Sequence, residues 1–300
     1  MYMNRFCVVL IRGLMRFFGS LPLRFHYMLV GTVAWILEKV IGYRKSVIYV
    51  NLARSFPEKK YWELDRIAHD FYIHMAEIIL ETIWFGGSSL KRLRESHIVE
   101  MANVKVLDDA FEASPSVTLL YSHCGNWELL GGLPIYNYDD SVNNPCTLEQ
   151  TYVVYRRLSN HVWNDVFLKN RIAPIPDYKG EIESEQVLRL CIKNRKKKAV
   201  YFFIADQSPY FTKFDLGMFM NQHTKAMVGS VAVAHKLGHS VVYMNMARCG
   251  RGHYEMQFTK ICDDASKVDP EVLLRQYFDL LEKDIRTDPA NWLWSHKRWK

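Results

Sequence analysis

From Val104 onward, short apolar runs typical of buried strands alternate with longer amphipathic segments typical of helices. Runs of apolar and β-branched residues predict strands at residues 117–121, 153–155, 172–175, 199–205, 241–246 and 254–258. Helices are predicted at residues 158–168, 181–193, 227–237 and 271–286. Alternation of this kind predicts an α/β fold with a mostly parallel, mixed sheet flanked by helices.

The strand predicted at residues 117–121 runs into the sequence S-H-C-G-N-W-E, residues 122–128. A Gly-Asn pair in this segment is expected to end the strand, which puts His123 at its carboxyl end, where open α/β sheets bind ligands. Glu128 is expected to accept a hydrogen bond from the imidazole. Such a pair is a general base, because the carboxylate fixes the tautomer and the other ring nitrogen takes a proton from a hydroxyl.

Two other features of this segment bear on the chemistry. The backbone amides of Gly125 and Asn126, close to a predicted helix start, are candidates for an oxyanion hole. Cys124 is an alternative thiol nucleophile, but neighbours on a strand point to opposite faces, so it is not expected to meet the histidine. The chain has no G-x-S-x-G sequence, which argues against a serine hydrolase. A substrate alcohol is therefore the expected nucleophile.

Charged residues flank several of the other predicted strands. Arg156 ends the strand at 153–155 and either binds a lipid phosphate bidentately or is a solvated surface arginine. Asp206 follows the strand at 199–205 and is expected to orient Arg156, bind the acceptor or cap a turn. Arg171 is a weaker phosphate candidate, because it opens its predicted strand instead of ending it.

The composition limits the partners. A net charge of +7 and a pI near 9.0 admit nucleic acid, an anionic membrane surface or an acidic protein. No recognised nucleic-acid motif accompanies the charge, so nucleic acid is not expected. The basic run at 195–198 and the basic, Trp-rich C-terminus are the candidate contacts for an acidic protein and a membrane interface. Six scattered cysteines without a C-x-x-C pair predict neither a disulfide framework nor a metal site.

The N-terminal residues 1–45 differ from the rest of the chain. Two apolar stretches, 6–18 and 21–41, carry interspersed basic residues, and the longest uncharged run is shorter than the roughly 20 residues of a spanning helix. This pattern predicts a helical anchor in one leaflet, with a tilted span or a helix packed on its own domain as alternatives. Residues 46–300 then form the catalytic domain. Ser55 and Glu58, at capping-box spacing, predict the start of a long helix that continues through Trp84.

The segment at 122–128 resembles the H-x-x-x-x-[DE] signature of glycerolipid acyltransferases, and its G-N-W-E-L form is similar to the bacterial lipid A biosynthesis acyltransferases, the lauroyl or myristoyl acyltransferases. The similarity extends to a segment before the long helix, a Y-R step, a D-Q pair and a W-x-H-[RK]-R terminus, which are residues 51–58, 155–156, 206–207 and 294–298.

The resemblance implies transfer of an acyl chain from acyl carrier protein to a hydroxyl of a membrane lipid, by His123 and Glu128, at the cytoplasmic face of the inner membrane. No metal or bound cofactor is required. Gln207 of the D-Q pair and Thr224, in a Thr-to-Gly step that the family shares, are candidate substrate contacts.

Two departures from the family pattern concern acceptor recognition. Arg157 stands where the family usually has proline, and the loop at 137–150 is longer than expected. The expected acceptor is a lipid A precursor, with a lysophospholipid or an aminolipid as alternatives. A thioesterase or lipase using the same residues, and a non-enzymatic lipid-binding protein, are the other functional hypotheses.

Overall fold

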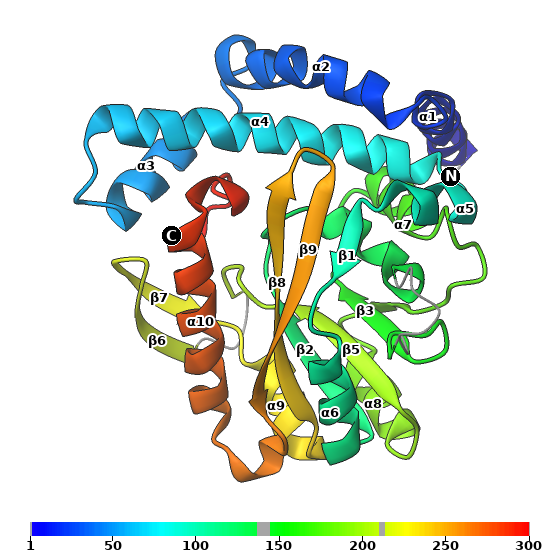
Figure 1. Ribbon diagram of the computed structural model, residues 1–300, viewed down its shortest axis with the longest axis vertical. Coiled ribbons are helices and arrows are strands. Elements are labelled where there is room, and N and C mark those ends of the chain that lie inside the picture. Colours follow the sequence, from blue (N-terminus) through cyan, green and yellow to red (C-terminus); the bar gives the residue numbers. More distant parts are fainter. Residues whose placement is uncertain (1, 137–144, 210–213, 300) are drawn as a thin grey trace.

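The computed structural model describes residues 2–136, 145–209 and 214–299, and its centre is a seven-stranded sheet (Figure 1). The strands are β1 (Val99–Met101), β2 (Ser116–Tyr121), β3 (Thr151–Tyr155), β4 (Glu181–Glu183), β5 (Ala199–Ile204), β8 (Ser240–Gly250) and β9 (His253–Cys262), in the order β1-β9-β8-β2-β5-β3-β4. From β8 to β4 neighbouring strands are parallel, β9 is antiparallel to β8, and β1 is parallel to β9. The predicted mostly parallel mixed sheet is confirmed.

Five of the six predicted strands are confirmed, and the one predicted at 172–175 is wrong. Those residues form turns after α7 (His161–Arg171), because Pro174 and Pro176 cannot donate to a sheet ladder. The helix predicted at 181–193 is partly wrong, since its first residues form β4 and only α8 (Val187–Asn194) is helical. The long loop predicted at 137–150 lies partly outside the described residues.

Helices cover both faces of the sheet (Figure 1). One face packs on α5 (Leu90–Ser96), α6 (Lys105–Ala113) and the 3₁₀ helix η2 (Trp127–Ile135), and the other on α8, α9 (Gly229–Leu237) and α10 (Pro270–Thr287). Strand β2 contributes Leu119 to one core and Leu120 to the other. A strand that is buried on both faces has a continuous apolar sequence, which is why the sequence predicted β2 correctly. Outside this sheet, the C-terminal half also contains the hairpin of β6 (Phe214–Phe219) and β7 (Gln222–Ala226) and the 3₁₀ helices η3 (Ala265–Lys267) and η4 (Pro289–Asn291).

The long helix begins later than predicted. Ser55 is the last residue of α3 (Lys45–Ser55), and α4 (Tyr61–Gly86) starts after Lys60, with Glu63 completing its capping box. Pro57 explains the break, because the residue before a proline is disfavoured in the helical conformation. Helix α4 lies across one end of the sheet (Figure 1).

The N-terminal helices lie on the outer side of α4 (Figure 1). They are α1 (Tyr2–Gly19) and α2 (Leu23–Trp35), and the latter continues into the π-helical turn η1 (Ile36–Val40). Val30 and Ala34 of α2 pack against α4, whereas Phe17 and Met28 are 67% and 79% exposed. Within the described residues no single helix has the length and apolarity to cross a membrane, although the pair Arg5–Gly19 and Leu23–Val40, bent by 111°, passes by length and composition. The interfacial anchor therefore stays a prediction.

Candidate active site

The site is built where the parallel strands β2 and β5 end side by side. Their register pairs Tyr121 with Ile204, so the second residues beyond the strands, His123 and Asp206, are brought together. The backbone N–H of His123 donates to Asp206 Oδ2 at 3.0 Å, and the ring Nδ1 lies 2.8 Å from Asp206 Oδ1. The paired strand ends therefore place a carboxylate directly against the imidazole.

Asp206 is almost completely buried, at 2% exposure, and it accepts a further hydrogen bond from Trp292 Nε1 at 2.8 Å. Burial by itself raises the pKa of Asp206, but the charge of His123 and hydrogen bonds from His123 and Trp292 lower this pKa to about 2. An ionised carboxylate can only accept hydrogen bonds. The proton between the two side chains therefore belongs to His123 Nδ1, so in the neutral imidazole Nε2 carries the available lone pair.

The other side of the imidazole faces polar and aromatic neighbours. Gln207 Nε2 lies 3.0 Å from His123 Nε2, and the Trp127 ring packs edge-on against the imidazole with centroids 5.0 Å apart. With Nε2 unprotonated, the Gln207 amide is the donor of that hydrogen bond. A neutral imidazole oriented by a carboxylate through one nitrogen can accept a proton at the other, which is general-base chemistry.

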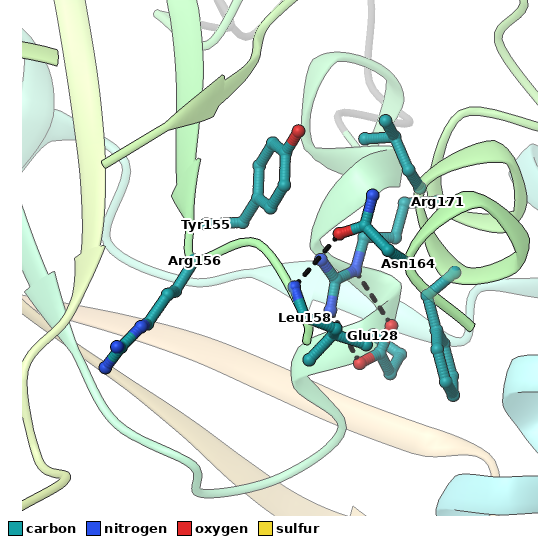
Figure 2. Close-up of a pocket in the computed structure, with 8 residues that line it drawn as sticks. Glu128, Tyr155, Arg156, Leu158, Asn164 and Arg171 are labelled. Carbon is teal, nitrogen blue, oxygen red and sulfur yellow. Dashed lines mark hydrogen bonds and ion pairs between the residues drawn. The ribbon is translucent and has the colours of Figure 1, made fainter. Parts of the chain in front are cut away.

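Glu128 does not have the position that the sequence predicted. Both of its carboxylate oxygens accept hydrogen bonds from Arg171, Nε to Oε2 and Nη2 to Oε1, each at 2.9 Å (Figure 2). Since Asp206 holds the Nδ1 of His123, the expected hydrogen bond from the imidazole to Glu128 is corrected to one with Asp206. The reason is tertiary: η2 begins at Trp127 and carries Glu128 towards the end of α7.

Arg171 is the last residue of α7 and does not open a strand. Burial works to lower the pKa of its guanidinium, but the charge of Glu128 and the hydrogen bonds to it outweigh burial and raise that pKa. The side chains of Arg171 and Glu128 are 23% and 10% exposed, so the ion pair is largely shielded from solvent. The bidentate geometry fixes both side chains.

A pocket of about 180 Å³ lies beside this ion pair. Its lining residues are Glu128, Tyr155, Arg156, Leu158, Asn164, Phe167, Leu168 and Arg171. Arg156 is exposed after the last residue of β3, and Figure 2 shows its side chain extending away from the Glu128–Arg171 pair. The predicted phosphate candidates Arg156 and Arg171 thus line one pocket, and Arg171 binds Glu128 there.

The predicted oxyanion hole is wrong. The Gly125 N–H donates to the backbone and side-chain oxygens of Asn291 at 3.2 and 3.1 Å, and the Asn126 N–H donates to Met246 Sδ at 3.2 Å. Both amides therefore have partners inside the protein. Gly125 has a φ of +65°, and a Cβ there would come within 2.6 Å of Met246, so the chain turns sharply into these contacts.

A comparison with protein families identifies the family of this chain. Residues 1–300 match the model of a family described as bacterial lipid A biosynthesis acyltransferase. The chain belongs to this family. It is therefore an acyltransferase, and the non-enzymatic lipid-binding hypothesis is excluded. A search of curated proteins found no match. The family is typically membrane-associated.

Two other sequence expectations for the acyltransferase need correction. Thr224, the candidate substrate contact, lies within β7, where its buried hydroxyl donates to Gln222 O and accepts from Trp299 Nε1, so its partners are inside the protein. The C-terminal Trp292 and Trp294 are 3% and 0% exposed, so they belong to the core and not to a membrane interface. The thiol alternative stays disfavoured, as expected, because Cys124 is buried and burial raises the pKa of its thiol.

Two parts of the acyltransferase site were not predicted from the sequence: the hydrogen bond that His123 Nδ1 donates to Asp206, and the support from Trp292 and Asn291. The contact between His123 and Asp206 could have been predicted, because each residue follows a buried strand by the same number of positions. The support from the C-terminal residues could not, since their contacts depend on how α10 and η4 return to the sheet. Among the described residues, no group of three His, Cys, Asp or Glu side chains has the arrangement to hold a metal ion.

Proposed function

We propose that this acyltransferase moves a fatty acyl chain from an acyl carrier protein thioester to a hydroxyl of a lipid A precursor, with His123 as general base and Asp206 as the residue that orients it. The observation that carries the proposal is the 2.8 Å contact between His123 Nδ1 and Asp206 Oδ1 at the carboxyl end of β2 and β5. Family membership supports lipid A biosynthesis as the setting.

In the proposed reaction the acceptor hydroxyl donates to His123 Nε2, in the place that the Gln207 amide occupies in the free enzyme. His123 takes the proton while the hydroxyl oxygen attacks the thioester carbonyl, and Asp206 stabilises the resulting imidazolium. Collapse of the tetrahedral intermediate breaks the carbon–sulfur bond. The leaving thiolate receives the proton back from Nε2, which restores the neutral base.

The pocket beside Glu128 and Arg171 suits a polar part of the acceptor. Its volume of about 180 Å³ is smaller than the roughly 300–1,000 Å³ of sites that enclose drug-sized ligands, so it fits a headgroup fragment and not a lipid. Arg156, exposed at the pocket, can offer a phosphate two parallel N–H donors. We assign this pocket to a phosphate or sugar group of the acceptor.

Glu128 and Arg171 are expected to act as one unit on that pocket. Glu128→Ala and Arg171→Ala should each lower kcat/KM by roughly 10- to 100-fold, because each leaves a largely shielded charge without its partner. Their double variant should be no worse than either single variant, as steady-state kinetics with varied acceptor will show. Losses that multiply in the double variant would instead mean that Glu128 acts independently of Arg171.

The carrier protein must present its thioester at the carboxyl end of β5. The basic run at 195–198 precedes the first residue of β5, so the length of this six-residue strand, about 20 Å, separates it from Asp206. Exposed Arg156 and Arg157 lie instead at the same edge as His123, after β3. We therefore propose that the acidic carrier approaches the edge bearing these two arginines and not the 195–198 run.

We propose that α1 and α2 hold the enzyme at the cytoplasmic face of the inner membrane. Their exposed apolar side chains include Phe17 and Met28, and the family is typically membrane-associated. Phe17→Glu with Met28→Glu should weaken cosedimentation with anionic phospholipid vesicles at least tenfold, since each apolar side chain contributes about 1.5–3 kcal/mol on burial. Val272→Glu, at an exposed position of α10, is the control. Equal loss in the control, or no loss in the double variant, would contradict this anchor.

Acceptor dependence tests the proposed reaction. Purified enzyme receives acyl carrier protein thioester or the matching coenzyme A thioester, with and without a lipid A precursor, and products are identified by mass spectrometry. The expected result is acylated precursor formed from the carrier thioester, with little thioester cleavage when the precursor is absent. Rapid cleavage that the precursor does not change would instead identify a hydrolase. Product formed only with a lysophospholipid or an aminolipid would overturn the assigned acceptor.

A further inference from the structure

A buried carboxylate on α4 reaches the turn that carries His123. Glu81 is 0% exposed, and its two oxygens accept three hydrogen bonds. Oε1 accepts from Tyr27 Oη of α2 at 2.9 Å, and Oε2 accepts from Tyr254 Oη of β9 and from Asn126 Nδ2, both at 2.8 Å. Donors from a helix, a strand and the turn after β2 therefore converge on one side chain.

Asn126 links Glu81 to the turn that carries His123 and Glu128. Its side chain is completely buried, with Nδ2 donating to Glu81 and Oδ1 accepting from the backbone N–H of Glu128 at 3.2 Å. The second contact caps the start of η2. Only the NH₂ end of the amide can donate to a carboxylate, so Glu81 decides which way the Asn126 amide faces.

We infer that Glu81 is a positioning residue for acyl transfer, which fixes Asn126 and through it the turn from His123 to Glu128. The inference rests on the proposed function of His123. The two sides of this turn are held separately: Gly125 is bound by Asn291, and Asn126 is bound by Glu81. Loss of the second contact frees the amide of Asn126 and the start of η2, and shifts His123 and Trp127 relative to the bound substrate.

The three donors around Glu81 need a side chain with acceptor oxygens at this position. Burial raises the pKa of Glu81 to about 7, against hydrogen bonds from Asn126, Tyr254 and Tyr27. A glutamine at position 81 could make the same three contacts, with its oxygen accepting from Asn126 and Tyr254 and its NH₂ group donating to Tyr27 Oη. Leucine at this position would leave all three partners without an acceptor, which is costly for buried polar groups.

Glu77, one helical turn earlier, provides a matched control. It is also 0% exposed, but it accepts hydrogen bonds from Arg248 and Arg251 at the end of β8 and the β8–β9 turn. Its contacts hold that hairpin to α4 and do not reach Asn126. Loss of the Glu77 carboxylate should therefore lower the melting temperature without changing kcat per folded molecule.

The first experiment compares Glu81→Gln, Glu81→Leu and Glu77→Gln in kcat, in KM for the acyl carrier protein thioester and in melting temperature. We expect Glu81→Gln to keep kcat within a few-fold of wild type, and Glu81→Leu to lose on the order of 10²-fold in kcat with KM unchanged, as for a misplaced catalytic group. A wild-type kcat per folded molecule in Glu81→Leu, or an equal loss in Glu77→Gln, would overturn the inference.

A second pair of variants keeps the test decisive even where Glu81→Leu does not fold. Asn126→Asp places a carboxylate against Glu81 Oε2 and should lower kcat strongly. The double variant Asn126→Asp with Glu81→Gln again pairs a donor with an acceptor, and should recover most of the lost kcat. No recovery would overturn the inference. Failure of the proposed function is distinguished separately, because it would appear as full activity in His123→Ala whatever the Glu81 variants do.

Discussion

Asp206→Asn is expected to lower kcat by about 10⁴-fold while the protein remains folded, by analogy with the aspartate of a serine-protease triad. Asp206 Oδ2 accepts from the His123 backbone N–H and from Trp292 Nε1, so the asparagine oxygen must stay at that position. Its NH₂ group then faces His123 Nδ1 and can only donate to it. The proton moves to Nε2, and the base loses the lone pair that takes the acceptor's proton.

The measurement is kcat at saturating acceptor and carrier thioester, with circular dichroism as the check on folding. Asp284→Asn is the matched control, because Asp284 is a partly buried carboxylate bonded to Tyr243 and does not touch His123. It should keep kcat within a few-fold. Because the pKa of Asp206 is lowered to about 2, its titration should not appear in the pH profile of wild type above about pH 4. An Asp206→Asn kcat within tenfold of wild type would remove Asp206 from the mechanism.

His123→Ala is expected to lower kcat by about 10⁴-fold, the upper end of the roughly 10²–10⁴-fold that general-base catalysis contributes, since the oriented pair acts as a unit. Combination with Asp206→Asn should add almost nothing to the loss, because an orienting carboxylate has no role without the imidazole. Single-turnover assays with radiolabelled acyl carrier protein thioester have the range to measure these rates.

His223→Ala serves as the control for the histidine. His223 is exposed on β7 and lies 3.2 Å from Asp215, so its loss should leave kcat unchanged. Transfer by His123→Ala at a rate within a few-fold of wild type would mean that another group takes the proton. A double variant much slower than His123→Ala would mean that Asp206 has a second role besides orienting the base.

The pairing of His123 with Asp206 leaves Glu128 with a function different from the one that the sequence suggested. Glu128 was expected to orient the imidazole, yet it holds Arg171 beside the pocket. The H-x-x-x-x-E spacing therefore places the proposed base and the Glu128–Arg171 ion pair at opposite ends of one turn. Asn126 lies between them and is held by Glu81. One short segment thus joins the proposed proton transfer to the proposed binding of the acceptor.

Local sequence patterns were sufficient to predict those parts of the structure that depend on residues close together in the chain. The apolar run of β2 predicted a buried strand, and the residues after it placed His123 at the ligand-binding edge of the sheet. Pro57 shows where such patterns mislead, because a capping-box spacing at Ser55 competes with the restriction that the proline puts on the residue before it. Local sequence patterns were therefore enough to predict the α/β class, the position of His123 at the sheet edge and the family.

The groups that surround His123, in contrast, follow from the tertiary structure. His123 and Asp206 are 83 residues apart, and they meet because β2 and β5 pair in parallel with their ends aligned. The same holds for the Gly125 and Asn126 amides, whose partners come from η4 and β8. Hydrogen-bond partners of this kind follow from strand register and helix packing, which bring distant segments together and leave no periodic signal in either segment.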